Sequence, residues 1–262
     1  MNLILFGSDE VQEDQVTVDC KDRRYIHCTT VLKVKELESV CRVGIVGGDM
    51  FDAQVVSLTD EFLRLKMISI RPEKTHSDLN ASLILAMPRP KVLDRLWPVF
   101  AQLGFRRVML INAERVENQY FHTHVVNEEN YRPKLIKGLE QAAATTRLPE
   151  VSVDKRTLDV FLAKRLDVAF PPERTNRFIC HPDEQADADR QNKAIPHDVN
   201  KETVIALGPE GGWLDHEISE LRNRGFLPVT CSSRIFTTDV AVIALTAAIV
   251  SRLNPSMLGG NI

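Results

Sequence analysis

Residues 204–213 read Val-Ile-Ala-Leu-Gly-Pro-Glu-Gly-Gly-Trp, an apolar run with β character that passes directly into a glycine-rich turn. A second passage, Ser-Arg-Ile-Phe-Thr-Thr-Asp-Val-Ala at residues 233–241, is a polar loop that opens onto an apolar helical run. In α/β proteins, loops at the ends of neighbouring strands hold small ligands through backbone groups. The two loops therefore predict an α/β fold with a ligand site between them.

From residue 79 onward, short β-type runs alternate with helical patterns. Strands separated by helices of about 10–15 residues favour a parallel sheet with helices on both faces. We expect strands at 81–87, 107–111, 150–153, 177–181, 203–208 and 227–231, with helices at 90–103, 130–145, 157–166, 214–224 and 239–253.

The first 70 residues follow a different pattern, with short strands and a single helix. The Gly-Gly-Asp run at 47–49 lies between two β-rich runs and predicts a hairpin. Small β domains of this kind commonly close into barrels. We expect strands at 3–6, 16–19, 41–46, 51–58 and 61–69, a helix at 22–34, a polar linker at 71–78, domains at 1–72 and 77–262, and a mobile acidic loop at 183–201.

Bulk composition excludes few functions. The chain has 33 Lys and Arg against 36 Asp and Glu, so it has no basic excess that would by itself indicate nucleic-acid binding. No apolar stretch approaches the roughly 20 residues needed to span a bilayer, and the first residues do not resemble a signal peptide. Five scattered cysteines without a Cys-x-x-Cys pair indicate reduced thiols. We therefore expect a cytoplasmic protein that binds no membrane.

The glycine-rich turn has alternative interpretations. It is not a Walker loop, because no Lys-Ser or Lys-Thr follows the glycines, and the chain lacks the Gly-x-Gly-x-x-Gly dinucleotide pattern after an early strand. A tight strand–helix turn without a ligand remains an alternative. His122 and His124 lack a third ligand at a suitable spacing, so we expect no metal site.

Four passages resemble one known family. Leu207–Trp213 is similar to the pattern (I/L)-G-P-E-G-G-(F/L), and Ser232–Ala241 is similar to G-x-R-(I/V)-L-R-T-E-(T/A)-A. Cys180-His181-Pro182 is a third match, and Arg147–Val151 is a weaker fourth. These passages resemble the 16S ribosomal RNA uracil-N3 methyltransferases, the small subunit methyltransferase E family of the SPOUT superfamily. The resemblance implies a PUA-like β-barrel that holds RNA, followed by a parallel-sheet domain with a C-terminal trefoil knot.

The resemblance also implies the reaction and the donor. The family transfers a methyl group from S-adenosylmethionine to N3 of a uridine in small-subunit (16S-type) ribosomal RNA, and needs no metal to do so. Its members are homodimers that meet through the knot and the last helix, and the apolar run Val240–Val250 suits such a buried helix. Carried over to this sequence, the donor is held by Leu207, Gly208, Pro209, Glu210, Gly211, Gly212, Cys231, Ser232, Ile235, Thr238 and Ala241.

Two residues of the second loop are candidates for catalysis. Loss of the N3 proton leaves negative charge on the uracil oxygens, and the planar guanidinium of Arg234 suits that charge. A surface ion pair is the alternative for Arg234. Asp239 can orient the substrate or accept the proton, or it can be a carboxylate favoured only by the helix dipole. Thr238 can equally be an N-cap residue.

The candidates for RNA binding are basic residues. Arg23, Arg24 and Lys33 lie in the expected barrel and Arg147 in the second domain. A solvated charged face is the alternative for the first three. Thr237 stands where the family has Arg, and residues 142–146 depart from the family pattern. A relative that binds RNA without methylating it, or one that methylates another RNA, is therefore the competing hypothesis.

Overall fold

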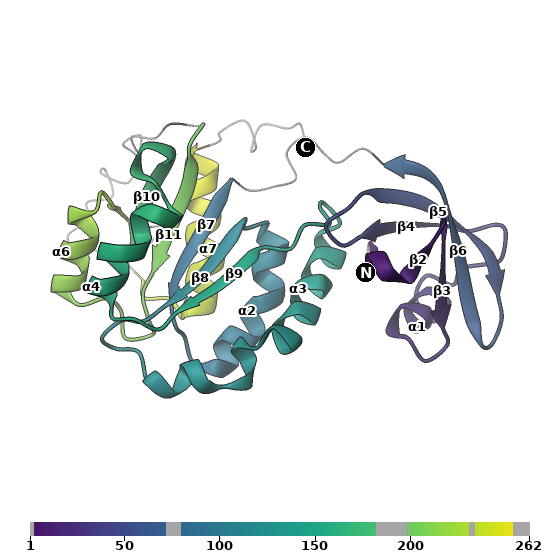
Figure 1. Ribbon diagram of the computed structural model, residues 1–262, viewed down its shortest axis with the longest axis horizontal. Helices are drawn as coiled ribbons and strands as arrows, with labels where there is room; N and C mark the ends of the chain where they lie inside the picture. The colour runs from purple at the N-terminus through teal and green to yellow at the C-terminus, as the bar shows by residue number, and fades with distance from the viewer. Residues whose placement is uncertain (1–2, 72–79, 182–197, 199, 231–233, 254–262) are drawn as a thin grey trace. The chain divides into compact units, whose positions relative to one another are not determined.

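The computed structural model describes residues 3–71, 80–181, 198, 200–230 and 234–253 (Figure 1). The chain divides into two compact units. One comprises residues 1–78, 100–104 and 132–148, and the other comprises residues 79–99, 105–131 and 149–262. The domain boundaries expected from sequence, 1–72 and 77–262, stay a prediction. The expected linker at 71–78 and the acidic loop at 183–201 fall almost entirely outside the described residues.

The first unit contains a curled, mixed sheet with the strand order β1-β4-β5-β6-β3-β2. β1 pairs with β4 in parallel and the other neighbours are antiparallel. The predicted hairpin is confirmed, since β4 and β5 pair around a turn at which Gly47 has a φ of 75°. The elements are β1 (Ile4–Phe6), β2 (Val11–Gln12), β3 (Gln15–Asp19), α1 (Arg23–Thr30), β4 (Val40–Ile45), β5 (Met50–Leu58) and β6 (Phe62–Arg71).

The second unit is built on a six-stranded sheet with the order β12-β10-β11-β7-β8-β9, in which every pairing is parallel. This confirms the expected α/β architecture. Its strands are β7 (Ala81–Ala86), β8 (Arg107–Ile111), β9 (Glu150–Asp154), β10 (Thr175–Cys180), β11 (Glu202–Leu207) and β12 (Leu227–Val229). The trefoil knot stays a prediction, because residues 182–197 and 231–233 lie outside the described part of the chain.

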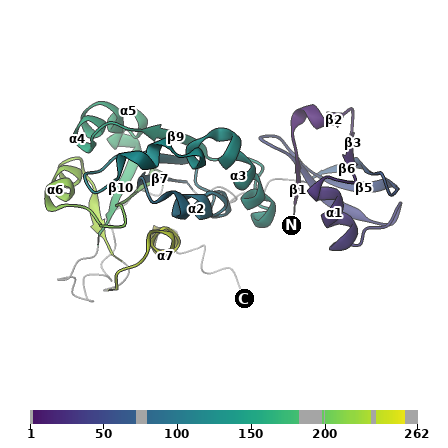
Figure 2. The same cartoon turned by 90° about the horizontal axis from the view of Figure 1, so that it is seen from below.

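Helices cover both faces of the parallel sheet. In Figure 2, α4 and α5 lie on one side of the sheet and α2 and α7 on the other. All six residues of β7 are buried, as expected for a strand covered on both faces. The helices are α2 (Pro90–Leu103), α3 (Glu128–Ala142), α4 (Leu158–Phe161), α5 (Asp167–Ala169), α6 (Asp215–Asn223) and α7 (Thr238–Leu253). None of the described helices is long and apolar enough to cross a bilayer.

Two expected helices differ in detail. The helix expected at 157–166 continues to Ala169, because a π-helical turn over Leu162–Leu166 joins α4 to α5. Leu162 and Leu166 at the two ends of that turn are both buried in the core. The helix expected at 22–34 ends at Thr30, and the Val31 N–H bonds back to the His27 carbonyl. Short 3-10 turns at 8–10, 118–122, 124–126 and 172–174 carry no strong sequence signal and were not expected.

Parallel register brings three strand ends together. Cys180, the last residue of β10, pairs with Leu207 at the end of β11 and with Val229 at the end of β12. Parallel neighbours run in one direction, so the loops that follow them leave from the same edge of the sheet. The glycine-rich turn after β11 therefore lies beside the segments that follow β10 and β12.

Arg177 in the middle of β10 is an almost buried cation that ties several elements to the sheet. Its guanidinium donates to Asp167 Oδ1 at 2.6 Å, to the Arg224 carbonyl at 2.7 Å and to the Phe170 carbonyl. A buried acceptor that loses its donor costs about 1–3 kcal/mol. Arg177 thus fixes the ends of α5 and α6 against the strand that borders the site.

Replacing Arg177 tests this role. We expect Arg177→Met to lower the free energy of unfolding by about 2–4 kcal/mol, because two buried carbonyls lose their donor. Urea denaturation followed by circular dichroism measures the change. Arg174→Met, at an exposed position nearby, should change it by no more than about 0.5 kcal/mol. Equal effects of the two substitutions would contradict the anchoring role.

Candidate functional site

One hollow occupies the edge of the sheet where β10, β11 and β12 end. Its volume is about 820 Å³, within the range of small-molecule sites. Described residues that follow each of the three strands line it, together with residues of α6 and α7. Nine of the expected donor-binding residues line it, and they are Leu207, Gly208, Pro209, Glu210, Gly211, Gly212, Ile235, Thr238 and Ala241. Cys231 and Ser232 lie outside the described residues.

The glycine-rich turn requires glycine at two positions. A Cβ on Gly208 would lie 3.1 Å from Cδ1 and from Nε1 of the Trp213 indole, closer than ordinary carbon contacts. Gly212 has a φ of 73°, a conformation that other residues avoid, and its N–H donates to the Pro209 carbonyl at 2.8 Å. The chain can therefore fold back tightly enough for the indole to reach the backbone of Gly208.

Trp213 is a wall of the hollow rather than a plug. Its side chain is 4% exposed and belongs to the core cluster that also contains Ile218 and Leu221 of α6. The hollow has its volume of about 820 Å³ with the indole in its observed position, so the side chain does not fill it. The tryptophan therefore closes the hollow on the side of the core.

Loops from the neighbouring strands support the turn from outside. The Arg89 N–H donates to Glu210 Oε1 at 2.8 Å, and the Arg115 guanidinium donates to the Gly211 carbonyl. The buried carboxylate of Glu217 accepts the N–H of Leu214 and that of Glu114, each at 2.9 Å. These bonds fix the turn before any ligand arrives. Such preorganisation lowers the ordering cost of binding.

Helix α6 begins directly after the glycine-rich turn. Asp215 is its first helical residue and Leu214 occupies the N-cap position. Glu217 accepts the Leu214 N–H from within the first turn. A carboxylate three residues after the cap is a recognised capping arrangement, so the sequence did contain the signal.

Two buried polar atoms at the hollow lack a partner. His181 Nδ1 and Trp213 Nε1 are shielded from solvent, yet no hydrogen-bond partner for either is found among the described residues. Both residues line the hollow. An unpaired buried polar group costs about 1–3 kcal/mol, which a polar ligand can recover. The chemistry of this site therefore suits a ligand with both apolar and hydrogen-bonding parts.

The two candidate catalytic residues lie in different surroundings. Arg234 is exposed and lines the hollow, whereas Asp239 does not appear among the described residues of its wall. Asp239 accepts a hydrogen bond from the Thr237 hydroxyl at 2.5 Å and pairs with Arg95 at 2.9 Å. These two contacts hold the pKa of Asp239 below its ordinary value. Its carboxylate also accepts the Val240 N–H at 3.2 Å, at the start of α7.

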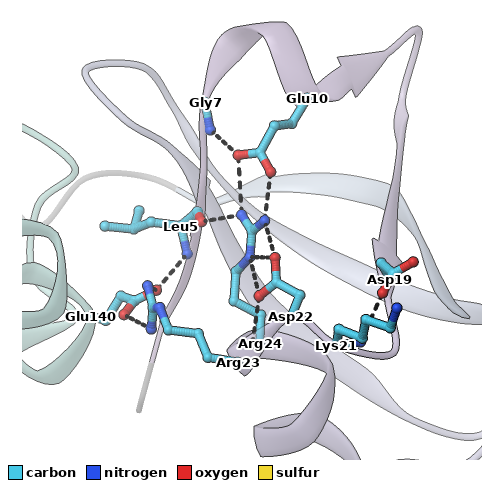
Figure 3. Close-up of polar contacts among 9 residues, drawn as sticks. All are labelled: Leu5, Gly7, Glu10, Asp19, Lys21, Asp22, Arg23, Arg24 and Glu140. Carbon is cyan, nitrogen blue, oxygen red and sulfur yellow. Dashed lines mark hydrogen bonds and ion pairs between the residues drawn. The ribbon is translucent and has the colours of Figure 1, made fainter. Parts of the chain in front are cut away.

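The arginines expected to bind RNA make ion pairs in the first unit (Figure 3). Arg24 donates to Glu10 Oε1 at 2.5 Å, to Asp22 Oδ2 at 2.6 Å and to the Leu5 carbonyl at 3.0 Å. Arg23 pairs with the buried Glu140 at 2.7 Å, and its side chain is 45% exposed. Arg24 is therefore engaged in holding the fold, whereas Arg23 keeps an exposed surface.

The other two expected RNA-binding residues lie on the surface. Lys33 is exposed, with a φ of 51°, in the segment between α1 and β4. Arg147 is exposed just before β9. Their role in RNA binding stays a prediction. Within the described part of the chain, no group of three or more His, Cys, Asp or Glu residues is suited to hold a metal ion.

Sequence reasoning missed three arginines at the site. Arg115 and Arg222 line the hollow together with Arg234, and Arg95 holds Asp239. Arg115 follows β8 and Arg222 lies in α6, so each reaches the hollow only because of the tertiary fold. No short motif surrounds any of them. Their positions could be found only from the order of the strands.

Alanine in place of two neighbouring glycines tests the packing of the turn. We expect Gly208→Ala to lower the free energy of unfolding by about 1–3 kcal/mol, because the new methyl group displaces the Trp213 indole. Gly211→Ala should be nearly neutral, since its Cβ would meet only the flexible Arg115 side chain. Thermal unfolding with tryptophan fluorescence measures both changes. If Gly208→Ala proved as stable as Gly211→Ala, the indole contact would not shape the turn.

Comparison with known proteins agrees with the site. A family model described as RNA methyltransferase domain matches residues 75–250. The chain is 26% identical over 255 residues to the ribosomal RNA small subunit methyltransferase E of Treponema pallidum, covering 96% of this chain and 91% of the relative.

Solved structures share the fold over nearly the whole length. A ribosomal RNA small subunit methyltransferase E from Neisseria gonorrhoeae, bound to S-adenosyl methionine, superposes with a TM-score of 0.67 at 20% identity and covers 94% of this chain and 96% of its own. A probable rRNA-methyltransferase from Porphyromonas gingivalis superposes with a TM-score of 0.70 at 17% identity and covers 98% of this chain and 100% of its own. The chain belongs to the RNA methyltransferase domain family and, within it, to the 16S ribosomal RNA small subunit methyltransferase E group.

Proposed function

We propose that this protein transfers the methyl group of S-adenosylmethionine to N3 of a uridine in small-subunit ribosomal RNA. One observation supports the proposal most strongly. All the described residues that the family motifs assign to the donor line the same hollow. RNA as the substrate follows from membership of an RNA methyltransferase family. The target atom follows from the family resemblance. An enzyme with this substrate would act in the cytoplasm.

The residues of the hollow fit S-adenosylmethionine. The donor, when bound, supplies an electrophilic methyl group on a sulfonium. The mixed apolar and polar wall of the hollow suits an adenine ring, and His181 Nδ1 and Trp213 Nε1 are buried polar atoms at that wall without a partner among the described residues. The backbone of Gly208 and Gly212 lies close to the hollow because neither residue carries a Cβ.

Arg234 is the residue best placed to act on the uracil. Its side chain is exposed at the rim of the hollow, where an RNA base can approach. A guanidinium directed at the uracil oxygens stabilises the negative charge that follows loss of the N3 proton. Orientation of base and donor in one crevice supplies the remainder of the rate increase.

In this proposal Asp239 positions the loop that carries Arg234 and does not take part in the chemistry. A carboxylate whose pKa lies below its ordinary value is a weak base, so it is poorly suited to take the N3 proton at neutral pH. Its contacts instead hold Thr237 beside the first turn of α7, and Arg95 holds Asp239 itself. The loop that carries Arg234 is thereby tied to the start of α7.

Helix α7 supplies the surface for a homodimer. Val242 and Ile249 are fully buried and Leu245 is 8% exposed on the inner face, whereas Val240 and Ile243 are each 47% exposed on the outer one. Ile235, in the loop before the helix, is 86% exposed. Val240 and Ile243, three residues apart on one face of α7, leave apolar surface exposed, and Ile235 lines the donor hollow. Such exposed apolar surface commonly marks contacts between proteins.

Nucleoside analysis tests the activity. Ribosomal RNA from cells lacking this protein should lack one N3-methyluridine, and the purified protein with S-adenosylmethionine should restore it. Calorimetry measures donor binding separately. Donor binding without any change in methyluridine would instead favour the competing hypothesis of a fold relative that only binds RNA.

Arg234→Ala should separate chemistry from donor binding. We expect kcat to fall by about 10²–10³-fold, the usual loss when one charge-stabilising donor is removed, with donor affinity changed less than about threefold. Single-turnover methylation and calorimetry measure the two quantities. Arg222→Ala, which also lines the hollow but lies in α6, is the matched control. Normal turnover by Arg234→Ala would show that Arg234 has no catalytic role.

A charge on the outer face of α7 should disrupt the dimer. We expect Ile243→Glu to give monomers at micromolar concentration, because two like charges would face each other across an apolar contact. Light scattering during size-exclusion chromatography measures the mass. Val168→Glu, a change at a 74% exposed apolar residue remote from α7 in the sequence, should leave the mass unchanged. A wild-type protein that is already monomeric would refute the proposed dimer.

A further inference from the structure

A second hollow lies in the same unit as the donor site, at edge strand β9. Its volume is about 410 Å³, and it shares no lining residue with the donor site. One wall is the carboxyl half of β9 with the two residues that follow it, and the other is the π-helical turn between α4 and α5. The lining residues are Met109, Ser152, Val153, Asp154, Lys155, Arg156 and Arg165.

The hollow is strongly positive. Lys155, Arg156 and Arg165 face a single carboxylate, that of Asp154. Asp154 is committed to Arg156, whose Nε lies 2.8 Å from Asp154 Oδ1 and whose Nη2 donates to Oδ2. In the part of the chain that the structure describes, the side chains of Lys155 and Arg165 have neither a hydrogen bond nor an ion pair. Arg165 thus has only the electrostatic attraction of Asp154, which already bonds to Arg156, and Lys155 lines the hollow without a hydrogen-bonded carboxylate among the described residues.

The π-helical turn brings Arg165 to this wall. Leu162 and Leu166 are 3% and 0% exposed, so both ends of the turn are anchored in the core. Five residues occupy a turn that an α-helix completes in fewer, and this shifts the side chains that follow. Such turns are uncommon and occur frequently at functional sites. Here the turn places a guanidinium opposite the edge strand of the sheet.

We propose that this hollow binds a phosphodiester group of the RNA substrate, with Lys155 and Arg165 as its contacts and Asp154 holding Arg156 beside them. The inference rests on the proposed function and assigns a second contact for the same substrate. Arginine and lysine are the residues that bind phosphate oxygens, by forked hydrogen bonds and by point charge respectively. The surplus of positive charge disfavours a metal cation or a basic peptide as the occupant.

The position of the hollow suits an RNA strand that enters the donor site. β9 and β11 are separated by β7 and β8 in the sheet, which is three strand spacings of about 4.8 Å, or roughly 14 Å. The carboxyl ends of all these parallel strands lie on one edge. An RNA strand spans that distance in at most about four nucleotides, because the roughly 3.4 Å of helix axis per phosphate of one strand is a lower bound on the separation of successive phosphates. One phosphate near the target uridine can therefore reach Lys155 and Arg165 while the base enters the donor hollow.

A double substitution with a matched control tests the assignment. Lys155→Gln/Arg165→Gln removes the two uncommitted cations, and Lys164→Gln/Arg174→Gln removes two exposed cations that line neither hollow. Fluorescence anisotropy with a short single-stranded, uridine-rich RNA is recorded over a series of salt concentrations. Inorganic phosphate is titrated as a competitor, and donor affinity is measured by calorimetry to show that each variant is folded.

We expect the first variant to bind RNA roughly ten- to thirty-fold more weakly at ~0.1 M salt. The salt slope should fall by about 0.7, because one phosphate charge is no longer neutralised. The control should be affected much less, and donor affinity should be unchanged in both. Equal weakening of the two variants would overturn the site, because only general electrostatics would then be at work. Phosphate binding that depends on Lys155 and Arg165 while RNA binding does not would assign the hollow to a free anion and overturn the RNA contact.

Failure of the phosphate site and failure of the proposed function would give different results. A wild-type protein that methylates RNA while the first variant binds RNA normally would remove this inference alone. A wild-type protein that binds neither the donor nor RNA would remove both.

Discussion

The functional part of this structure depends on the parallel register of β10, β11 and β12. Cys180, Leu207 and Val229 stand side by side at the ends of these strands. Because the strands are parallel, the three following segments leave the sheet together and enclose one hollow. A shift of one residue in any of these strands would turn its buried side chains to the opposite face and separate the loops. The register thus links hydrophobic burial in the core to the geometry of the ligand site.

Arginine serves two different purposes in the chain. Arg24 and Arg177 are surrounded by carboxylates and carbonyls and hold neighbouring segments together. Arg165, in the π-helical turn beside β9, is exposed. An arginine whose donors are already occupied has little to offer an RNA phosphate, whereas an exposed one can bind it. Net charge gives no hint of this division, because the chain as a whole carries slightly more acidic than basic residues.

The sequence predicted the second unit well, because strong apolar periodicity and glycine turns act locally. The helix expected at 90–103 and the strand expected at 107–111 are found with those bounds, and most other elements differ by one to three residues. The continuation from Asp167 to Ala169 was missed, because it depends on a π-helical turn whose Leu162 and Leu166 pack in the core. At the site, the glycines of the turn at 208–212 were predictable, because they form one contiguous motif. Arg95, Arg115 and the Lys155–Arg165 pair were not, since strand order alone brings them into place.

In the proposed function, two loops separated in the sequence jointly hold one S-adenosylmethionine through their main chain. Backbone hydrogen exchange with and without this donor measures that joint binding directly. We predict slower exchange at the amides of Gly208 and 210–212 and at those of 235–241 together, with little change at the edge strand β9. Protection of only one of these segments, or of neither at saturating donor, would contradict the proposed binding mode.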